Sequence, residues 1–243
     1  MSVPSYVEHE PAGLEGWAEC LWERHAGPAG DIARVVPDGC MDLVWSAARG
    51  LSVVGPNTTA FLAPLPANGA ALGVRLHPGC APSLLGVSAE ALRDGAQEAA
   101  GLWQDEGKRL EARMARATDV RARRALLLDW LGERARSAPP PDPLVRAAAR
   151  SLSSDPETRI AALARELGVA ERRLRRRVVS QVGYGPKRLG RVLRLRRALD
   201  EVHAGCGLAE AAFGAGYADQ SHFTNDCTEL AGVPPASVFS KTN

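Results

Sequence analysis

A run of basic side chains is the feature of this sequence with the most distinctive chemistry. No acidic residue lies between Arg172 and Leu199, and eleven lysines and arginines lie between Arg172 and Arg197. Such a run repels itself unless counter-charge comes from elsewhere, and nucleic acid is the commonest polyanion of a cytosol. A solvated helix face is the alternative explanation. The elements that carry the run decide between the two.

The basic run lies within a repeated pattern. Residues 160–178, IAALARELGVAERRLRRRV, are similar to residues 208–227, LAEAAFGAGYADQSHFTNDC, when one residue is inserted in the second copy. In each copy an alanine permits close helix crossing, a glycine ends the first helix in left-handed backbone, and an apolar residue fills the corner. An apolar stripe then marks the buried side of a second helix. These positions are Ala164, Gly168, Val169, Leu174 and Val178 in one copy, and Ala212, Gly216, Tyr217, Phe223 and Cys227 in the other.

This pattern is typical of the helix-turn-helix, whose second helix enters the DNA major groove. A single helix-glycine-helix occurs in many bundles. Two copies, over 158–182 and 207–231, joined by one predicted helix over 186–203, are far more specific.

Residues 144–240 resemble the DNA-binding domain of AraC/XylS-family transcriptional regulators. The closest match is GYADQSHF at residues 216–223, followed by GVPP at 232–235. In the first half, VPDGCMDLVW (36–45) and GVRLHPG (73–79) are similar to an uncharacterised domain fused to this module in many actinobacterial members. The resemblance implies a bacterial, sequence-specific, one-component regulator that binds double-stranded DNA, with RNA polymerase as a further expected partner.

The recognition helices supply the candidate DNA-binding residues. An arginine can bind guanine O6 and N7 with two hydrogen bonds, and asparagine or glutamine can pair with adenine. We expect base contacts from Arg172, Arg175 and Arg176, and phosphate contacts from Arg173 and Arg177. In the second unit the outward polar residues are Gln220, Ser221, Thr224 and Asn225. Lys187, Arg188 and Arg191, on the connecting helix, are expected to neutralise backbone phosphates between the two grooves.

Charge makes the two units unequal. Residues 1–141 carry a net charge of −3, residues 142–197 carry +10, and residues 198–243 carry −5. Family members usually have a basic residue near the positions of Asn225 and Thr228, and this sequence has none there. Since phosphate contacts supply most of the non-specific affinity for DNA, the second unit should bind DNA weakly. The alternative function is therefore a ligand-, metal- or redox-sensing protein whose second unit binds DNA weakly or not at all.

Two differently built halves flank a proline-rich linker at 137–143, SAPPPDP. The first, 1–136, is predicted to be an α+β sensory domain: a small curved sheet or barrel, with strands near 20–22, 33–36, 40–45, 51–54 and 71–76, followed by helices. Those helices are expected near 83–85, from Ser88 as N-cap, and over 106–117 and 119–136. The second half is predicted to be all-α, with helices near 144–153, 158–167, 170–182, 186–203, 208–214, 219–230 and 235–239.

The first domain is the expected effector-binding domain, and Trp22, Cys40 and Trp45 are its candidate ligand contacts. The tryptophans are alternatively core residues, which we expect for most of them. The apolar face of the 106–136 helix pair either covers the sheet or forms a dimer seam, so both a monomer and a homodimer are permitted.

Several classes of protein are disfavoured. The sequence has no membrane span, no secretory signal and five scattered cysteines, which indicates a cytoplasmic protein with reduced thiols. No hydrolase, zinc-protease or nucleotide-binding motif is present, so neither enzymatic activity nor a cofactor is expected. His77 and Cys80, with Cys40 or His25, form a weak metal-site hypothesis, and Cys40 would be reactive only if its pKa were lowered.

Overall fold

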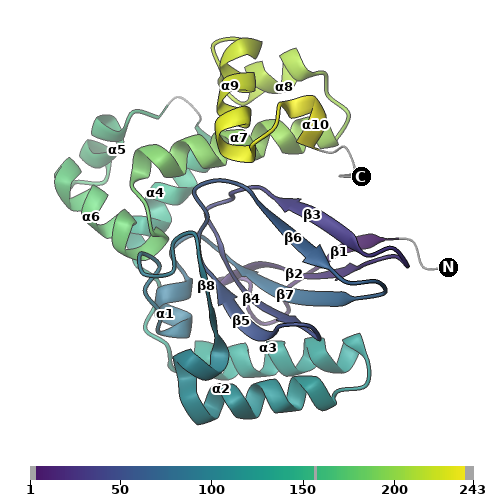
Figure 1. The fold of residues 1–243 in the computed structure, drawn as a ribbon. Helices are drawn as coiled ribbons and strands as arrows, with labels where there is room; N and C mark the ends of the chain where they lie inside the picture. The colour runs from purple at the N-terminus through teal and green to yellow at the C-terminus, as the bar shows by residue number, and fades with distance from the viewer. Residues whose placement is uncertain (1–3, 156–157, 239–243) are drawn as a thin grey trace.

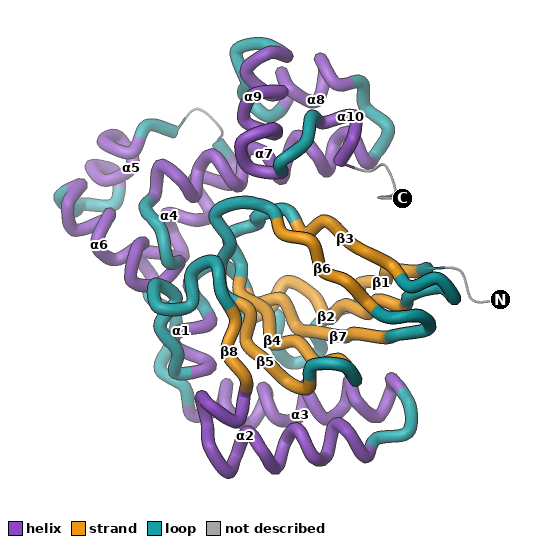
Figure 2. The backbone as a smooth tube through the Cα atoms, viewed as in Figure 1, coloured by secondary structure: helices purple, strands orange, loops and turns teal. Residues whose placement is uncertain are grey.

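Two antiparallel sheets form the first half of the chain. The computed structural model describes residues 4–155 and 158–238. The larger sheet has the order β1-β2-β7-β4-β5-β8, and the smaller one pairs β3 with β6 (Figure 2). The sheets do not close on each other, so the curved-sheet alternative is correct and the barrel is not. The strands are β1 (Ser5–His9), β2 (Ala18–His25), β3 (Asp31–Val35), β4 (Met41–Ser46), β5 (Gly50–Val54), β6 (Phe61–Leu65), β7 (Ala70–Leu76) and β8 (Ala96–Glu98).

One face of the larger sheet is covered by helices. Leu21, Leu43 and Val74, which pair across the neighbouring strands β2, β7 and β4 and so share one face of the sheet, are fully buried. Helices α2 (Ala99–Arg116) and α3 (Val120–Ser137) lie across this face (Figure 1), and α1 (Ala81–Leu85) contributes to the same core. Leu110 and Leu127 are buried there, so this apolar face of the helix pair covers the sheet rather than forming a dimer seam.

In the first half one predicted helix is wrong, and three strands, β1, β6 and β8, were not predicted. Ser88 begins a single turn and no helix, because Asp94, at φ +57°, turns the chain into β8, which pairs with β5. Helix α2 starts at Ala99, but Gln104, at φ +48°, breaks it, so the predicted helix 106–117 corresponds to the part of α2 that follows the break. Strand β1 was missed because it is an exposed polar edge, and β6 because it contains Pro64, which a two-stranded edge ribbon tolerates.

The second half is helical and has its own core. Pro143 opens α4 as Ser137 ends α3, and the side chain of Asp142 caps α4 by accepting a hydrogen bond from the Leu144 amide. The helices are α4 (Pro143–Ser154), α5 (Ile160–Glu166), α6 (Glu171–Val182), α7 (Pro186–His203), α8 (Leu208–Gly214), α9 (Gln220–Ala231) and α10 (Pro235–Val238). The last predicted helix and the domain limit at 240 extend beyond the described residues. No helix in the described part is long and apolar enough to cross a membrane.

Candidate nucleic-acid interface

The first helix-turn-helix unit is α5 followed by α6. Gly168 has φ +66°, a left-handed conformation that L side chains rarely adopt, and it turns the chain between the two helices. The amide of Val169 then donates to the carbonyl of Ala164 at 2.9 Å. Leu174 and Val178 on α6 are fully buried. The structure of this corner therefore agrees with the prediction made from the repeat.

The second unit, α8 followed by α9, repeats this geometry. Gly216 has φ +78°, and the amide of Tyr217 donates to the carbonyl of Ala212, again at 2.9 Å. Phe223 and Cys227 are fully buried. The side chain of Asp219 caps α9 by accepting a hydrogen bond from the amide of His222. The corner hydrogen bond and the buried stripe are therefore the same in both copies, as inferred from sequence, whereas the side-chain cap of α9 has no counterpart at Ala170, the residue before α6.

The outward side of α6 is almost entirely guanidinium. All five of its arginines are exposed: Arg172, Arg173, Arg175, Arg176 and Arg177. Arg177 differs from the other four because its Nε lies 2.5 Å from Oδ2 of Asp142, the buried cap of α4. That ion pair fixes α6 to α4, so Arg177 also positions the recognition helix.

On α9 the candidate side chains are polar and uncharged. Gln220, Ser221 and Asn225 are exposed, and Thr224 is half-buried. The hydroxyl of Thr224 donates to the carbonyl of Gln220 at 2.8 Å, one turn earlier. The amides and the free hydroxyl on this face could contact base edges, but none of these candidate side chains is a cation that could contact a phosphate.

The connecting helix α7 turns part of its basic face toward α9. Nη2 of Arg191 lies 2.6 Å from both Asp226 Oδ1 and Glu229 Oε2. Nη1 of Arg188 lies 3.4 Å from Glu229, and Nη2 donates to the carbonyl of Thr58. Hydrogen bonding to Arg191 lowers the pKa of Glu229 below its ordinary value.

These contacts change the interpretation of two predicted phosphate contacts. Arg188 and Arg191 have carboxylate partners inside the molecule, whereas Lys187 is exposed. Part of the acidity of the second unit is thereby neutralised by α7. Net charge along the sequence could not show this, because the partners lie 35 or more positions apart.

Groups from the first half bind the carbonyl ends of both recognition helices. Beyond the end of α6, Nη1 of Arg93 donates to the carbonyl of Gly183 at 2.9 Å. At the end of α9, the amide of Ala60 donates to Leu230 at 2.7 Å, and Nη1 of Arg34 donates to Ala231 at 3.1 Å. Sequence reasoning missed these residues, since nothing local marks an arginine as the partner of a carbonyl far along the chain.

The three candidate effector residues do not line one cavity. Trp45 is buried in the core beneath the helices, with the Arg123 guanidinium 4.3 Å from its ring centre. Trp22 points to the opposite face of the sheet, where its Nε1 donates to Asp42 at 2.9 Å and its ring packs on Gly73. Trp45 and Trp22 are separated because their strands present them on opposite faces.

Cys40 is buried between the two halves, with Sγ 3.5 Å from Oε1 of Glu19. Burial, followed by the nearby Asp38 and Glu19, raises the thiol pKa well above its ordinary value, so the condition for a reactive thiol is not met. Cys80 is also buried and contacts Arg146 at 3.1 Å. Within the described residues no three His, Cys, Asp or Glu side chains gather as a metal site.

Two family matches divide the chain. Residues 163–241 match the helix-turn-helix domain, and residues 8–98 match a domain of unknown function (DUF6597). Each match covers less than half of the chain. No curated protein matches it.

Two solved structures of ToxT share the fold of this chain, each with a TM-score above 0.5. An apo variant of ToxT from Vibrio cholerae strain SCE256 is similar at 12% identity, with a TM-score of 0.54, over 92% of this chain and 97% of that one. ToxT from Vibrio cholerae O395 is similar at 10% identity, with a TM-score of 0.51, over 91% and 97%. A probable AraC family transcriptional regulator from Rhodopseudomonas palustris CGA009 is similar at 20% identity over 40% of this chain and 94% of that one, with a TM-score of 0.36.

Proposed function

We propose that this chain is a one-component transcriptional regulator. It joins an AraC-type helix-turn-helix domain to an N-terminal domain of unknown function. AraC-type domains belong to DNA-binding transcription regulators, and that class is not enzymatic. The finer proposal is that one chain reads two adjacent major grooves, with α6 in one and α9 in the next, under control of a small molecule bound by the N-terminal half.

The observation that carries this proposal is the pairing of two geometrically equivalent helix-turn-helix corners with an exposed arginine face on α6. Arg172, Arg175 and Arg176 are exposed on α6, the second helix of the unit, and in a helix-turn-helix it is this helix that contacts base edges. Because Arg177 is tied to Asp142, its proposed phosphate contact is shared with a positioning role. Lys187 is proposed as the phosphate contact of α7.

The second unit is proposed to read bases while adding little non-specific affinity. Its outward residues are amides and hydroxyls, and the nearest arginines of α7 already face Asp226 and Glu229. Most counterion release on binding would then come from the first unit. A sensor whose second unit does not bind DNA is the rival function, favoured by this lack of exposed cations on α9.

Selection of bound duplexes from a random DNA pool, using the full chain at two salt concentrations, tests the proposal. Wild type should enrich a bipartite motif with half-sites about one helical turn apart. Arg176→Ala should blur one half-site, because losing a bidentate guanine contact costs about 1–3 kcal/mol of discrimination. Asn225→Ala should blur the other.

The matched control is Arg109→Ala, which removes an exposed arginine of α2 and should leave the motif unchanged. Salt-sensitive binding without any motif would refute sequence-specific regulation. A motif with a single half-site would favour the rival function.

A further inference from the structure

A cavity of about 480 Å³ lies where the two halves of the chain meet. Glu19 and His77 line it from the sheet side, Arg146 and Arg150 from α4, and Arg196 and Arg197 from α7. None of the effector candidates inferred from sequence is among its lining residues. Its volume falls within the range of roughly 300–1,000 Å³ that small-molecule sites occupy.

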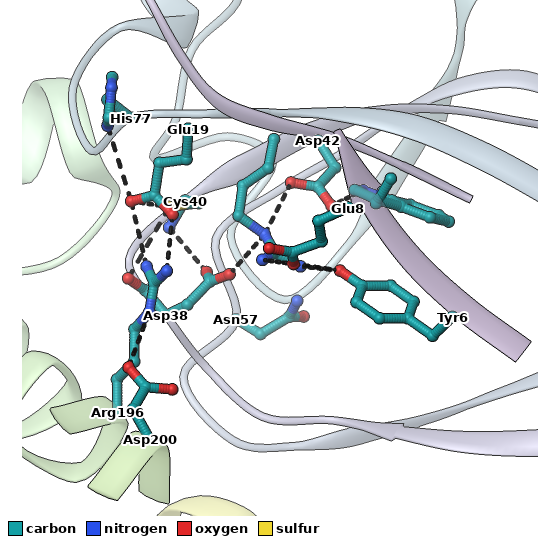
Figure 3. A network of polar contacts seen from close by, with 12 residues as sticks. Tyr6, Glu8, Glu19, Asp38, Cys40, Asp42, Asn57, His77, Arg196 and Asp200 are labelled. Atoms are coloured by element: carbon teal, nitrogen blue, oxygen red, sulfur yellow. Dashed lines mark hydrogen bonds and ion pairs between the residues drawn. The ribbon is translucent and has the colours of Figure 1, made fainter. Parts of the chain in front are cut away.

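The cavity wall is unusually rich in guanidinium groups. Four arginines face two carboxylates, Glu19 and Asp200. Figure 3 shows Arg196 between these two carboxylates, with Nη2 2.8 Å from Glu19 Oε2 and Nε 4.0 Å from Asp200 Oδ2. Within the described part of the chain, Arg196 alone of the four has carboxylate partners; Arg146 donates to the carbonyl of Gly16, and Arg150 and Arg197 form no ion pair. The wall therefore has an excess of cations.

From this wall we infer that the cavity binds a small organic dianion, a dicarboxylate or a phosphate monoester. The planar guanidinium matches both kinds of oxyanion through paired hydrogen bonds. Pro78, Ala149 and Leu193 line the same space and can contact the carbon skeleton of such a ligand. Two negative charges would balance the excess of two arginines.

The position of the cavity couples a bound anion to the recognition helices. Helix α7 connects the two units, and α4 holds α6 through Asp142. An anion on Arg196 competes with Glu19, which belongs to the first half. Binding therefore exchanges a contact between the halves for a contact with the ligand. This regulatory consequence rests on the proposed function, whereas binding itself does not.

Thermal unfolding of the full chain tests the site, with succinate and glycerol 3-phosphate as separate probes at constant ionic strength. A ligand that binds only the folded state raises the melting temperature with its concentration. The double variant Arg150→Ala/Arg197→Ala should bind the effective probe at least about tenfold more weakly, since charge-assisted hydrogen bonds are lost. Arg109→Ala/Arg116→Ala removes two exposed arginines of α2 and should respond like wild type.

Two outcomes would overturn the inference. One is that neither probe shifts the melting temperature of wild type; if loss of Arg150 and Arg197 then weakens DNA binding, the cavity wall belongs to the interface with the DNA backbone. The other is that both double variants respond as wild type does, which would indicate a non-specific effect of anions. If a probe binds but the protein selects no DNA motif, the anion site is supported and only the proposed function is refuted.

Discussion

At the scale of single residues, the side chains around Glu19 show how burial and partners compete. Burial opposes ionisation of Glu19, but hydrogen bonds from His77 and Arg196 outweigh it and lower the pKa of Glu19 from 4.5 to about 2. The folded protein therefore binds fewer protons than the unfolded chain between these two pH values. The ionised form of Glu19 stabilises the contact between the halves above about pH 4.5, and this contribution is lost as the pH falls toward 2.

Glu19→Gln should accordingly lower the free energy of unfolding by roughly 1–3 kcal/mol at pH 7. The difference from wild type should shrink as the pH is lowered from 4.5 to 2. Urea denaturation followed across this range measures it, with the exposed Glu90→Gln as control. A difference that stays constant with pH would show that Glu19 does not act through its charge.

At the scale of elements, each helix-turn-helix corner depends on a glycine in left-handed backbone. A Cβ added at Gly168 would meet no atom within 4 Å, so a side chain there is penalised by the backbone conformation alone. Gly214, at the end of α8, also has open space around it but does not have positive φ. Because an added methyl group is not crowded at either position, a difference between the two alanine variants measures the strain of the left-handed backbone at Gly168.

We expect Gly168→Ala to destabilise the protein by about 1–2 kcal/mol. Gly214→Ala should be neutral or stabilising by up to about 1 kcal/mol, because alanine is the better helix former. Chemical denaturation of both variants gives the comparison. Equal effects from the two substitutions would contradict the role assigned to the corner glycine.

At the scale of the whole molecule, the first half holds the two recognition helices at their C-terminal ends. Arg93 bonds to the carbonyl that follows α6, and Arg34 and Ala60 bond to carbonyls at the end of α9. The ends of α6 and α9 are therefore fixed to one common body. Their separation sets the spacing of DNA half-sites that a single chain can contact.

Removing both arginine contacts should relax that spacing. Arg34→Ala/Arg93→Ala is expected to bind the best-spaced duplex roughly 2- to 10-fold more weakly and to accept a broader range of half-site separations. Affinity measured over duplexes that differ only in spacer length tests this, with Arg109→Ala/Arg116→Ala as the matched pair. An unchanged spacer preference would mean that the connecting helix alone sets the distance.

The sequence by itself determined the parts of this protein that local chemistry controls. The two corners, their glycines and the buried stripes Leu174/Val178 and Phe223/Cys227 follow from helical periodicity and the conformational freedom of glycine. The exposure of the arginines of α6 follows from the same periodicity, since they lie outside the buried stripe. The wrong helix at Ser88 and the unpredicted strand β6 lie where a pairing partner far along the chain overrode the local preference.

Only the tertiary structure decided which charges meet. Contacts between distant segments decide whether Arg191 faces DNA or Asp226, and whether Trp22 and Trp45 lie on the same face of the sheet. They also decide whether arginines of α4 and α7 line a cavity together with Glu19. Such contacts leave no periodic signal, because an arginine is equally compatible with solvent, phosphate or a carboxylate until the fold brings one of them near. The geometry of the recognition units is thus a local property of this chain, and their coupling to the first half is a property of the whole molecule.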